Sequence, residues 1–106
     1  RVIGAEGAIG GTYGVMPELF LKLNEHVIAG EMEKARELQY AVNEIIYKMC
    51  SAHGNMYGVI KEILRMNENL DLGSVREPLA ALVPEDMPIV KEAAQMVRDA
   101  ISKYCA

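Results

Sequence analysis

The stretch whose residue types could support chemistry is glycine-rich and lies near the N-terminus, in the run GAEGAIGGTYG from Gly4 to Gly14. It contains five of the nine glycines of the chain. A glycine in a helix interior costs about 1 kcal/mol relative to alanine, so we expect no helix here. With Val2 and Ile3 in front, the run predicts a short buried strand that leads into a turn, where small residues let a ligand or a packed neighbour approach the backbone.

Neither of two common glycine-rich nucleotide-binding motifs fits this run. A P-loop needs a lysine followed by serine or threonine at its end, and the first lysine of the chain is Lys22. The dinucleotide fingerprint needs the spacing GxGxxG, which glycines at positions 4, 7, 10, 11 and 14 do not provide. A tight turn without any ligand therefore remains an alternative interpretation of the glycines.

The histidines and cysteines do not form a metal or nucleophilic site that spacing alone could identify. His26 and His53 lie on different elements and lack a recurring acidic or histidine partner one turn away, which favours surface or capping roles. Cys50 and Cys105 have no CxxC spacing, so we expect reduced thiols of a cytoplasmic protein rather than a disulfide or zinc framework. We expect neither a metal nor a cofactor.

The charge balance argues against two classes of partner. The net charge is −4 and no basic run is present, whereas nucleic acid and anionic membrane surfaces both require a basic face. No apolar stretch approaches the roughly 20 residues of a membrane span, and no signal peptide is visible. We therefore expect no nucleic acid and no membrane among the partners.

The elements that must position the glycine run follow directly after it, because apolar residues recur with helical periodicity from Met16 onward. The first helix has Pro17 in its first turn and Gly30 as its C-terminal cap. The last helix has Asp86 as its expected N-terminal cap and Pro88 near its first turn. Four helices are predicted, at about 17–30, 31–51, 55–66 and 86–104, with a non-helical connection at 67–84.

The length of 106 residues suits one domain with a modest core. Because the chain starts at Arg1 and runs straight into an apparent buried strand, we expect it to be part of a larger protein. The alternative is a freestanding four-helix interaction or scaffold domain, since the amphipathic helices could pack as a bundle.

Several runs of the sequence resemble one enzyme family in the family's own order: GAEGAIGGTYGVMPELF, then a helix ending in AG, then EMEKARELQ, and later VREPLAAL. Together they resemble the C-terminal part of the N-acetylneuraminate lyase and dihydrodipicolinate synthase family, over essentially the whole chain. The first run is similar to the lyase pattern G-A-D/E-G-x-I-G-S-T-Y. Arg76, Pro78 and Leu79 resemble the element that precedes the family's final helix.

The resemblance implies the C-terminal part of a (β/α)8 barrel, in a chain that is itself mainly α-helical. Residues 1–30 would be the last βα unit, with the eighth strand and its helix. Residues 31–106 would be a C-terminal helical extension.

The resemblance also implies a class I aldolase, in which a lysine forms a Schiff base with pyruvate and a tyrosine moves protons. Both residues would lie upstream of Arg1, so this chain would hold no catalytic residue, would be inactive alone, and Tyr13 would not replace the missing tyrosine. The resemblance is nearest to the N-acetylneuraminate lyases, which cleave a sialic acid or related 2-keto acid to pyruvate and an aldehyde sugar. A condensation of the dihydrodipicolinate synthase type is the alternative, and a homo-oligomer is expected.

Three positions carry over as substrate-binding residues. Ile9 matches the position whose backbone carbonyl lies by the Schiff-base lysine, and Gly10 and Gly11 match backbone positions that line the substrate pocket. The lyase pattern has a serine where Gly11 stands, and its hydroxyl contacts the sugar-acid chain. One such hydrogen bond contributes about 0.5–1.5 kcal/mol, so a 2-keto acid other than a sialic acid remains open as the substrate.

Overall fold

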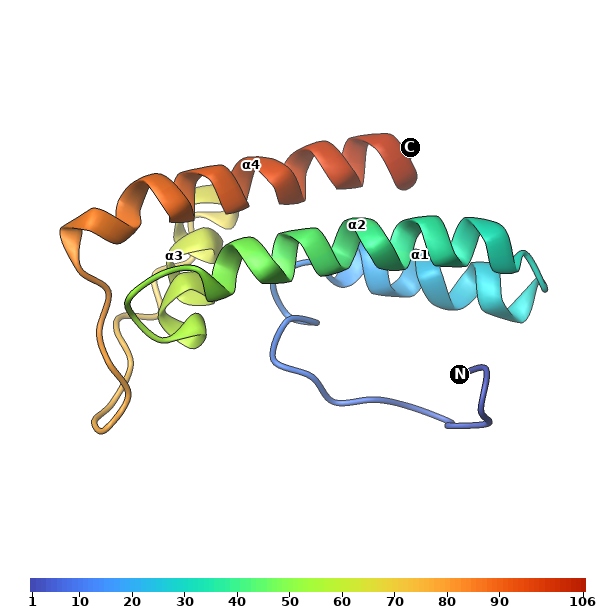
Figure 1. The fold of residues 1–106 in the computed structure, drawn as a ribbon, viewed down its shortest axis with the longest axis horizontal. Helices are drawn as coiled ribbons and strands as arrows, with labels where there is room; N and C mark the ends of the chain where they lie inside the picture. Colours follow the sequence, from blue (N-terminus) through green and yellow to red (C-terminus); the bar gives the residue numbers. More distant parts are fainter.

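The computed structural model describes residues 1–106 and contains four α-helices and one short 3-10 helix, without any β-strand. In Figure 1, α1 and α2 lie side by side, α4 runs along α2, and α3 lies at one end of the layer. The N-terminal segment and the connection between α3 and α4 both project to the same side of the helices. The elements are α1 (Pro17–Ile28), α2 (Met32–Cys50), α3 (Met56–Glu68), η1 (Pro84–Asp86) and α4 (Met87–Tyr104).

The predicted first helix is confirmed, and its two ends follow the expected local chemistry. Pro17 occupies the first helical position, where its missing N–H costs no intrahelical hydrogen bond. At the other end Gly30 has φ +75°, its N–H donates to the Val27 carbonyl, and the Glu31 N–H donates to the His26 carbonyl at 2.9 Å. These two bonds form a Schellman motif, which explains why α1 stops and α2 can turn back against it.

The core is formed by the apolar stripes of all four α-helices. Fully buried residues lie at helical spacing along α2, and the stripes of α1, α3 and α4 pack against them. The largest apolar side chains with almost no exposed surface are Met16, Leu19, Leu38, Val42, Ile45, Met49, Val59, Ile63, Val90 and Val97.

Asp86 is the residue at the N-terminal cap of α4, as expected, but it does not cap the helix with its side chain. The fully buried carboxylate instead accepts hydrogen bonds from the backbone N–H groups of His53 (2.7 Å), Gly54 (2.9 Å) and Val83 (3.1 Å). The donors of the α2–α3 turn face the carboxylate directly, so the acid fixes that turn to the start of α4 instead of serving its own helix.

The electrostatics of Asp86 follow from these contacts. Burial alone would disfavour the charged carboxylate, but three backbone N–H groups and the His53 ring, whose Nδ1 lies 3.1 Å from Oδ1, outweigh it. The pKa of the Asp86 carboxyl is therefore held well below its ordinary range. His53 thus contributes both its backbone N–H and its ring to the contact that joins the α2–α3 turn to Asp86.

The N-terminal segment, residues 1–14, is called the arm below, and it departs from the sequence prediction. It is mostly extended and exposed rather than a buried strand, and Val2, Ile3 and Ile9 all face solvent. The backbone N–H groups from Ala5 to Thr12 donate no hydrogen bond within the chain. A strand needs a neighbouring strand for its ladder, and no other extended segment of this chain pairs with the arm.

None of the four helices is long and apolar enough to cross a lipid bilayer.

Candidate functional site

The three residues predicted to bind substrate lie together at the end of the arm, just before the chain enters the core. Ile9, Gly10 and Gly11 are exposed. Directly after them Thr12 is buried, and Met16 has no exposed surface. Gly10 and Gly11 therefore lie next to the packed helices in the chain and far from the free end of the arm.

Gly11 lies against an aromatic ring that arrives from a distant part of the sequence. A Cβ atom at this position would lie 2.7 Å from Cε1 of Tyr57. Tyr57 is fixed near the start of α3, where its N–H donates to the side chain of Asn55, the N-terminal cap of that helix, at 2.9 Å. A glycine at this position is explained by the close approach of the Tyr57 ring.

The neighbouring glycine has a similar environment. A Cβ at Gly10 would lie 3.1 Å from the ring of Tyr13, and Tyr13 packs edge-to-face on Phe20 of α1 with ring centroids 4.2 Å apart. Aromatic rings therefore flank both glycines. Sequence reasoning missed Tyr57, because no spacing in the chain connects the start of α3 with the glycine run.

The chemistry available at this site is recognition by the backbone. The N–H groups of Gly10 and Gly11 and the carbonyl of Ile9 have no backbone partner within the chain. Paired N–H groups that no Cβ covers can bind an anionic oxygen such as a carboxylate. These backbone groups can therefore hold and orient an anion.

The lysines of the chain are not arranged for Schiff-base chemistry. None of them is buried, whereas a nucleophilic amine is usually found in a desolvated pocket or beside another cation. Lys48 forms an ion pair with Glu92 at 2.9 Å, and Lys61 donates to the Ser74 carbonyl at 2.8 Å. The described residues also contain no cluster of three or more histidine, cysteine or acidic side chains that could hold a metal ion.

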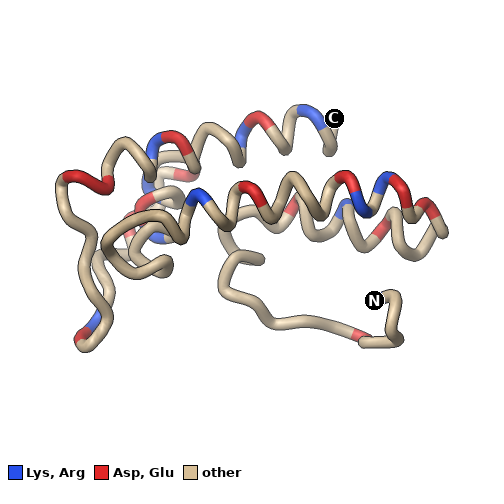
Figure 2. The backbone as a smooth tube through the Cα atoms, in the orientation of Figure 1, with Lys and Arg blue, Asp and Glu red and all other residues tan.

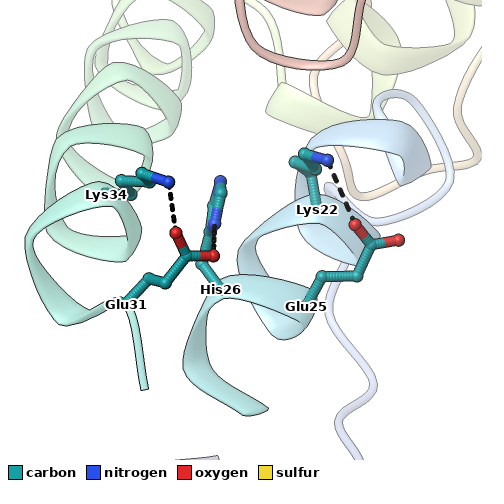
Figure 3. Close-up of polar contacts among 5 residues, drawn as sticks. All are labelled: Lys22, Glu25, His26, Glu31 and Lys34. Atoms are coloured by element: carbon teal, nitrogen blue, oxygen red, sulfur yellow. Dashed lines mark hydrogen bonds and ion pairs between the residues drawn. The ribbon is translucent and has the colours of Figure 1, made fainter. Parts of the chain in front are cut away.

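The charged residues around the α1–α2 turn serve structure (Figure 3). Lys34 and the His26 ring both contact the Glu31 carboxylate, and Lys22 pairs with Glu25 at 3.2 Å. The hydrogen bond from Lys34 and then that from His26 lower the pKa of Glu31. The His26 ring is largely buried and joins the end of α1 to Glu31 just before α2.

Comparison with known proteins identifies the context of this site. The chain matches the dihydrodipicolinate synthetase family over residues 2–97. It is 74% identical over 104 residues to an N-acetylneuraminate lyase from Mediterraneibacter gnavus, covering 98% of this chain and 33% of that protein. An N-acetylneuraminate lyase from Haemophilus influenzae is 32% identical over 84 residues, covering 79% of this chain and 28% of that protein.

A solved structure extends the likeness to three dimensions. The wild-type Ruminococcus gnavus sialic acid aldolase superposes with a TM-score of 0.97 at 74% identity, covering 98% of this chain and 35% of that one. The match lies in the C-terminal part of the aldolase, which is a (β/α)8-barrel enzyme, so the resemblance seen in the sequence and the expected fold class are confirmed. The chain spans about a third of the length of the relatives it matches.

Proposed function

The chain belongs to the dihydrodipicolinate synthetase family, and we propose on this basis that it is the C-terminal part of a pyruvate-dependent carbon–carbon lyase of the class I aldolase kind. The reaction is the cleavage of N-acetylneuraminate or a related 2-keto acid sugar to pyruvate and an aldehyde sugar. The observation that carries the proposal is the 74% identity to an N-acetylneuraminate lyase over 98% of this chain.

Within that enzyme the arm supplies binding groups and the rest of the protein supplies the Schiff-base lysine. Ile9 presents its backbone carbonyl toward that lysine, and Gly10 and Gly11 line the substrate pocket with their backbone. The free N–H groups of the two glycines support this role, because they can donate hydrogen bonds to the oxygens of a 2-keto acid without steric hindrance from a Cβ.

The proposal divides the chain into two parts. Residues 1–30 form the last βα unit of the barrel, and residues 31–106 form the helical extension. Support comes from the Schellman motif at Gly30, which ends α1 sharply, and from the extended path of the arm before it.

The test uses the protein expressed from its complete reading frame. We expect it to release pyruvate from N-acetylneuraminate and to be trapped by borohydride in the presence of pyruvate, with the adduct on one lysine outside the present chain. The 106-residue chain is the matched control and should gain no adduct, since none of its lysines is buried. A protein that is not trapped with pyruvate, or an adduct on a lysine of the 106-residue chain, contradicts the proposal.

A condensation of the dihydrodipicolinate synthase type is the second candidate, and the glycine at position 11 favours it. A site without the lyase serine has one fewer hydroxyl for a sugar-acid chain. Because an aldolase also runs in reverse, the aldehyde that it accepts distinguishes the two. In the synthetic direction the same protein should condense pyruvate with an aldehyde sugar if it is a lyase, and with a non-sugar aldehyde if it is a synthase. A freestanding helical domain is disfavoured, because the matching sequence of a relative at 74% identity makes up only a third of that protein's length.

We also propose a cytoplasmic location and a homo-oligomeric assembly. The free thiols of Cys50 and Cys105 favour a reducing compartment. Exposed aromatic side chains on one side of α2, Tyr40 and Tyr47, are typical of a surface that another subunit covers.

A further inference from the structure

Tyr57 carries a phenol hydroxyl that no residue of the chain uses. The backbone of this residue is fixed at the start of α3, because its N–H donates to the Asn55 side chain at 2.9 Å. The side chain is 49% exposed and its hydroxyl has no hydrogen-bond partner, whereas the hydroxyl of Tyr104 donates to Glu37. A tyrosine placed in this way can pack its ring and still offer a donor and an acceptor to a ligand.

The Tyr57 hydroxyl lies beside the place where a side chain at position 11 would begin. The three atoms nearest to a Cβ at Gly11 all belong to this ring: Cε1 at 2.7 Å, Oη at 3.2 Å and Cζ at 3.3 Å. The hydroxyl-bearing edge of the ring therefore faces Gly11. A serine hydroxyl stands one covalent bond beyond Cβ, so the Tyr57 oxygen lies at the edge of the volume that a serine at position 11 would fill.

The ring and a side chain at position 11 exclude each other. A carbon–carbon contact of 2.7 Å lies far inside the optimal separation of about 3.5–4.0 Å. Either residue 11 has a side chain and the ring turns away, or residue 11 is glycine and the ring stays beside it. This chain has the second arrangement, so the absence of a side chain at Gly11 lets the Tyr57 hydroxyl take its place.

The surroundings of the two residues carry no charge. The arm has only Arg1 and Glu6 as charged residues, and no lysine, arginine, aspartate or glutamate occurs at 7–17 or at 51–60. In Figure 2 the arm is almost entirely free of charge, whereas the helices carry both signs along their exposed faces. A neutral hydroxyl in such surroundings suits the hydroxyl groups of a sugar chain better than it suits a second anionic group.

We propose that the Tyr57 hydroxyl replaces the missing serine hydroxyl and binds the polyhydroxylated chain of the 2-keto acid substrate. Tyr57 is then a specificity-determining residue, which α3 of the helical extension brings to the end of the arm. A phenol and a serine hydroxyl offer the same hydrogen-bonding groups, one donor and an acceptor oxygen. This role of Tyr57 rests on the proposed function, because it takes Gly10 and Gly11 as part of the substrate pocket.

The phenol bears directly on the choice between cleavage of a sugar acid and condensation with a non-sugar aldehyde. The second candidate takes a hydroxyl to be absent at position 11, and Tyr57 supplies one from another element. With this hydroxyl in place, the pocket keeps the polar group that distinguishes a hydroxylated chain from an apolar one.

The test begins with Tyr57→Phe in the protein expressed from its complete reading frame, because this change deletes the hydroxyl and keeps the ring. The comparison substrate is a 2-keto acid aldol whose chain carries no further hydroxyl groups. We expect kcat/KM for N-acetylneuraminate to fall about three- to tenfold relative to that of the comparison substrate, the effect of one hydrogen bond. The fall should appear as a higher KM at nearly unchanged kcat, since the chain is held alike before and during the reaction.

A rescue experiment separates the hydroxyl from the packing of the ring. Gly11→Ser in the Tyr57→Phe background returns a hydroxyl from the other side and should recover most of the lost preference. Gly11→Ala in the same background adds a Cβ without a hydroxyl and should recover none. Tyr47→Phe, which deletes a hydroxyl on the 65% exposed Tyr47 of α2, is the matched control and should change the preference less than about twofold.

Borohydride trapping with pyruvate distinguishes failure of this role from failure of the proposed function, because it reads the Schiff base without the sugar chain. Normal trapping of Tyr57→Phe together with a lost preference and a rescue by serine supports the role of Tyr57. Normal trapping with an unchanged preference, an equal effect of Tyr47→Phe, or a rescue by alanine as good as that by serine overturns it and leaves the function standing. A parent protein that is not trapped contradicts the function, and the role of Tyr57 with it.

Discussion

Asp86 joins the α2–α3 turn to the start of α4. Its carboxylate accepts hydrogen bonds from three backbone N–H groups, two of them in the α2–α3 turn. Because its pKa is lowered below the ordinary value of 3.8, the ionised carboxylate stabilises the fold fully above about pH 4. That contribution is lost as the pH falls from there toward the pKa of the folded state.

We therefore predict that Asp86→Asn lowers the midpoint of urea unfolding at pH 7. The asparagine side chain cannot accept from the three backbone N–H groups and the His53 ring together. Its NH2 group would face other N–H groups. The parent chain should lose stability between pH 5 and pH 2 more steeply than the variant does. Urea unfolding at pH 7, pH 5 and pH 2, followed by circular dichroism, measures both effects. Glu85→Gln alters the exposed neighbouring carboxylate and is the control, whose stability should change little.

Gly11 allows a prediction about substrate choice in the full-length enzyme. Gly11→Ser and Gly11→Ala both require the Tyr57 ring to move, because any Cβ there meets it at 2.7 Å, but only the serine adds a hydroxyl. The ratio of kcat/KM for N-acetylneuraminate to that for other 2-keto acid aldols should therefore be higher for the serine variant than for the alanine variant and the parent. If the two variants have the same ratio, the hydroxyl at position 11 does not discriminate between substrates.

Individual residues were predictable where local backbone chemistry decides their role. Gly30 is at the end of α1 as expected, because only a residue that tolerates positive φ fits there. The side-chain role of Asp86 was misassigned, because its partners at His53 and Gly54 come from another turn and leave no local pattern. Tyr57 was missed for the same reason, since its contact with Gly11 exists only in the folded chain.

At the scale of elements, the connection between α3 and α4 is held by close approach as well as by hydrogen bonds. A Cβ at Gly54 would lie 2.8 Å from the Ala81 carbonyl oxygen and from Cα of Leu82, both backbone atoms that cannot turn aside. The Asn55 N–H donates to the Ala80 carbonyl at 2.9 Å, so the two segments are in direct contact.

Gly54→Ala should therefore destabilise the chain by about 1–3 kcal/mol, the typical cost of overpacking. Gly58 offers a matched control in α3, because a Cβ there would meet only side-chain atoms at ordinary distances, Leu82 at 3.4 Å and Val75 at 3.8 Å. Gly58→Ala should be neutral or stabilising, since alanine favours a helix interior. Urea unfolding at pH 7 compares the two, and equal free energies of unfolding would contradict the close approach.

The helices were predictable as elements and the strand was not, for one physical reason. An amphipathic helix satisfies its own backbone hydrogen bonds, so its period and its end signals lie within the sequence. A strand takes its hydrogen bonds from a neighbour. The arm has the apolar and glycine-rich composition of a barrel strand, but this chain contains no second strand to complete it.

For the molecule as a whole, we predict two regions of very different protection. In a solution of the 106-residue chain, the amides of residues 5–12 should exchange at rates close to those of an unstructured peptide, because they have no acceptor. The amides of α2, whose apolar face is fully buried, should be the slowest. Light scattering at increasing concentration should show association through the exposed arm.

A strictly monomeric chain with protected arm amides would contradict both expectations. It would mean that the arm has found a partner within the chain that the structure does not contain.

The nearly uncharged arm also determines which proteases can remove it. Trypsin cleaves after lysine and arginine, and none occurs between Arg1 and Lys22, so the most exposed segment of the molecule offers it no site beyond the first residue. Elastase, which cleaves after small apolar residues, can act at Ala5 and Ala8, where the backbone is extended and open. Brief digestion followed by mass spectrometry should therefore yield a trimmed helical body with elastase and an intact arm with trypsin.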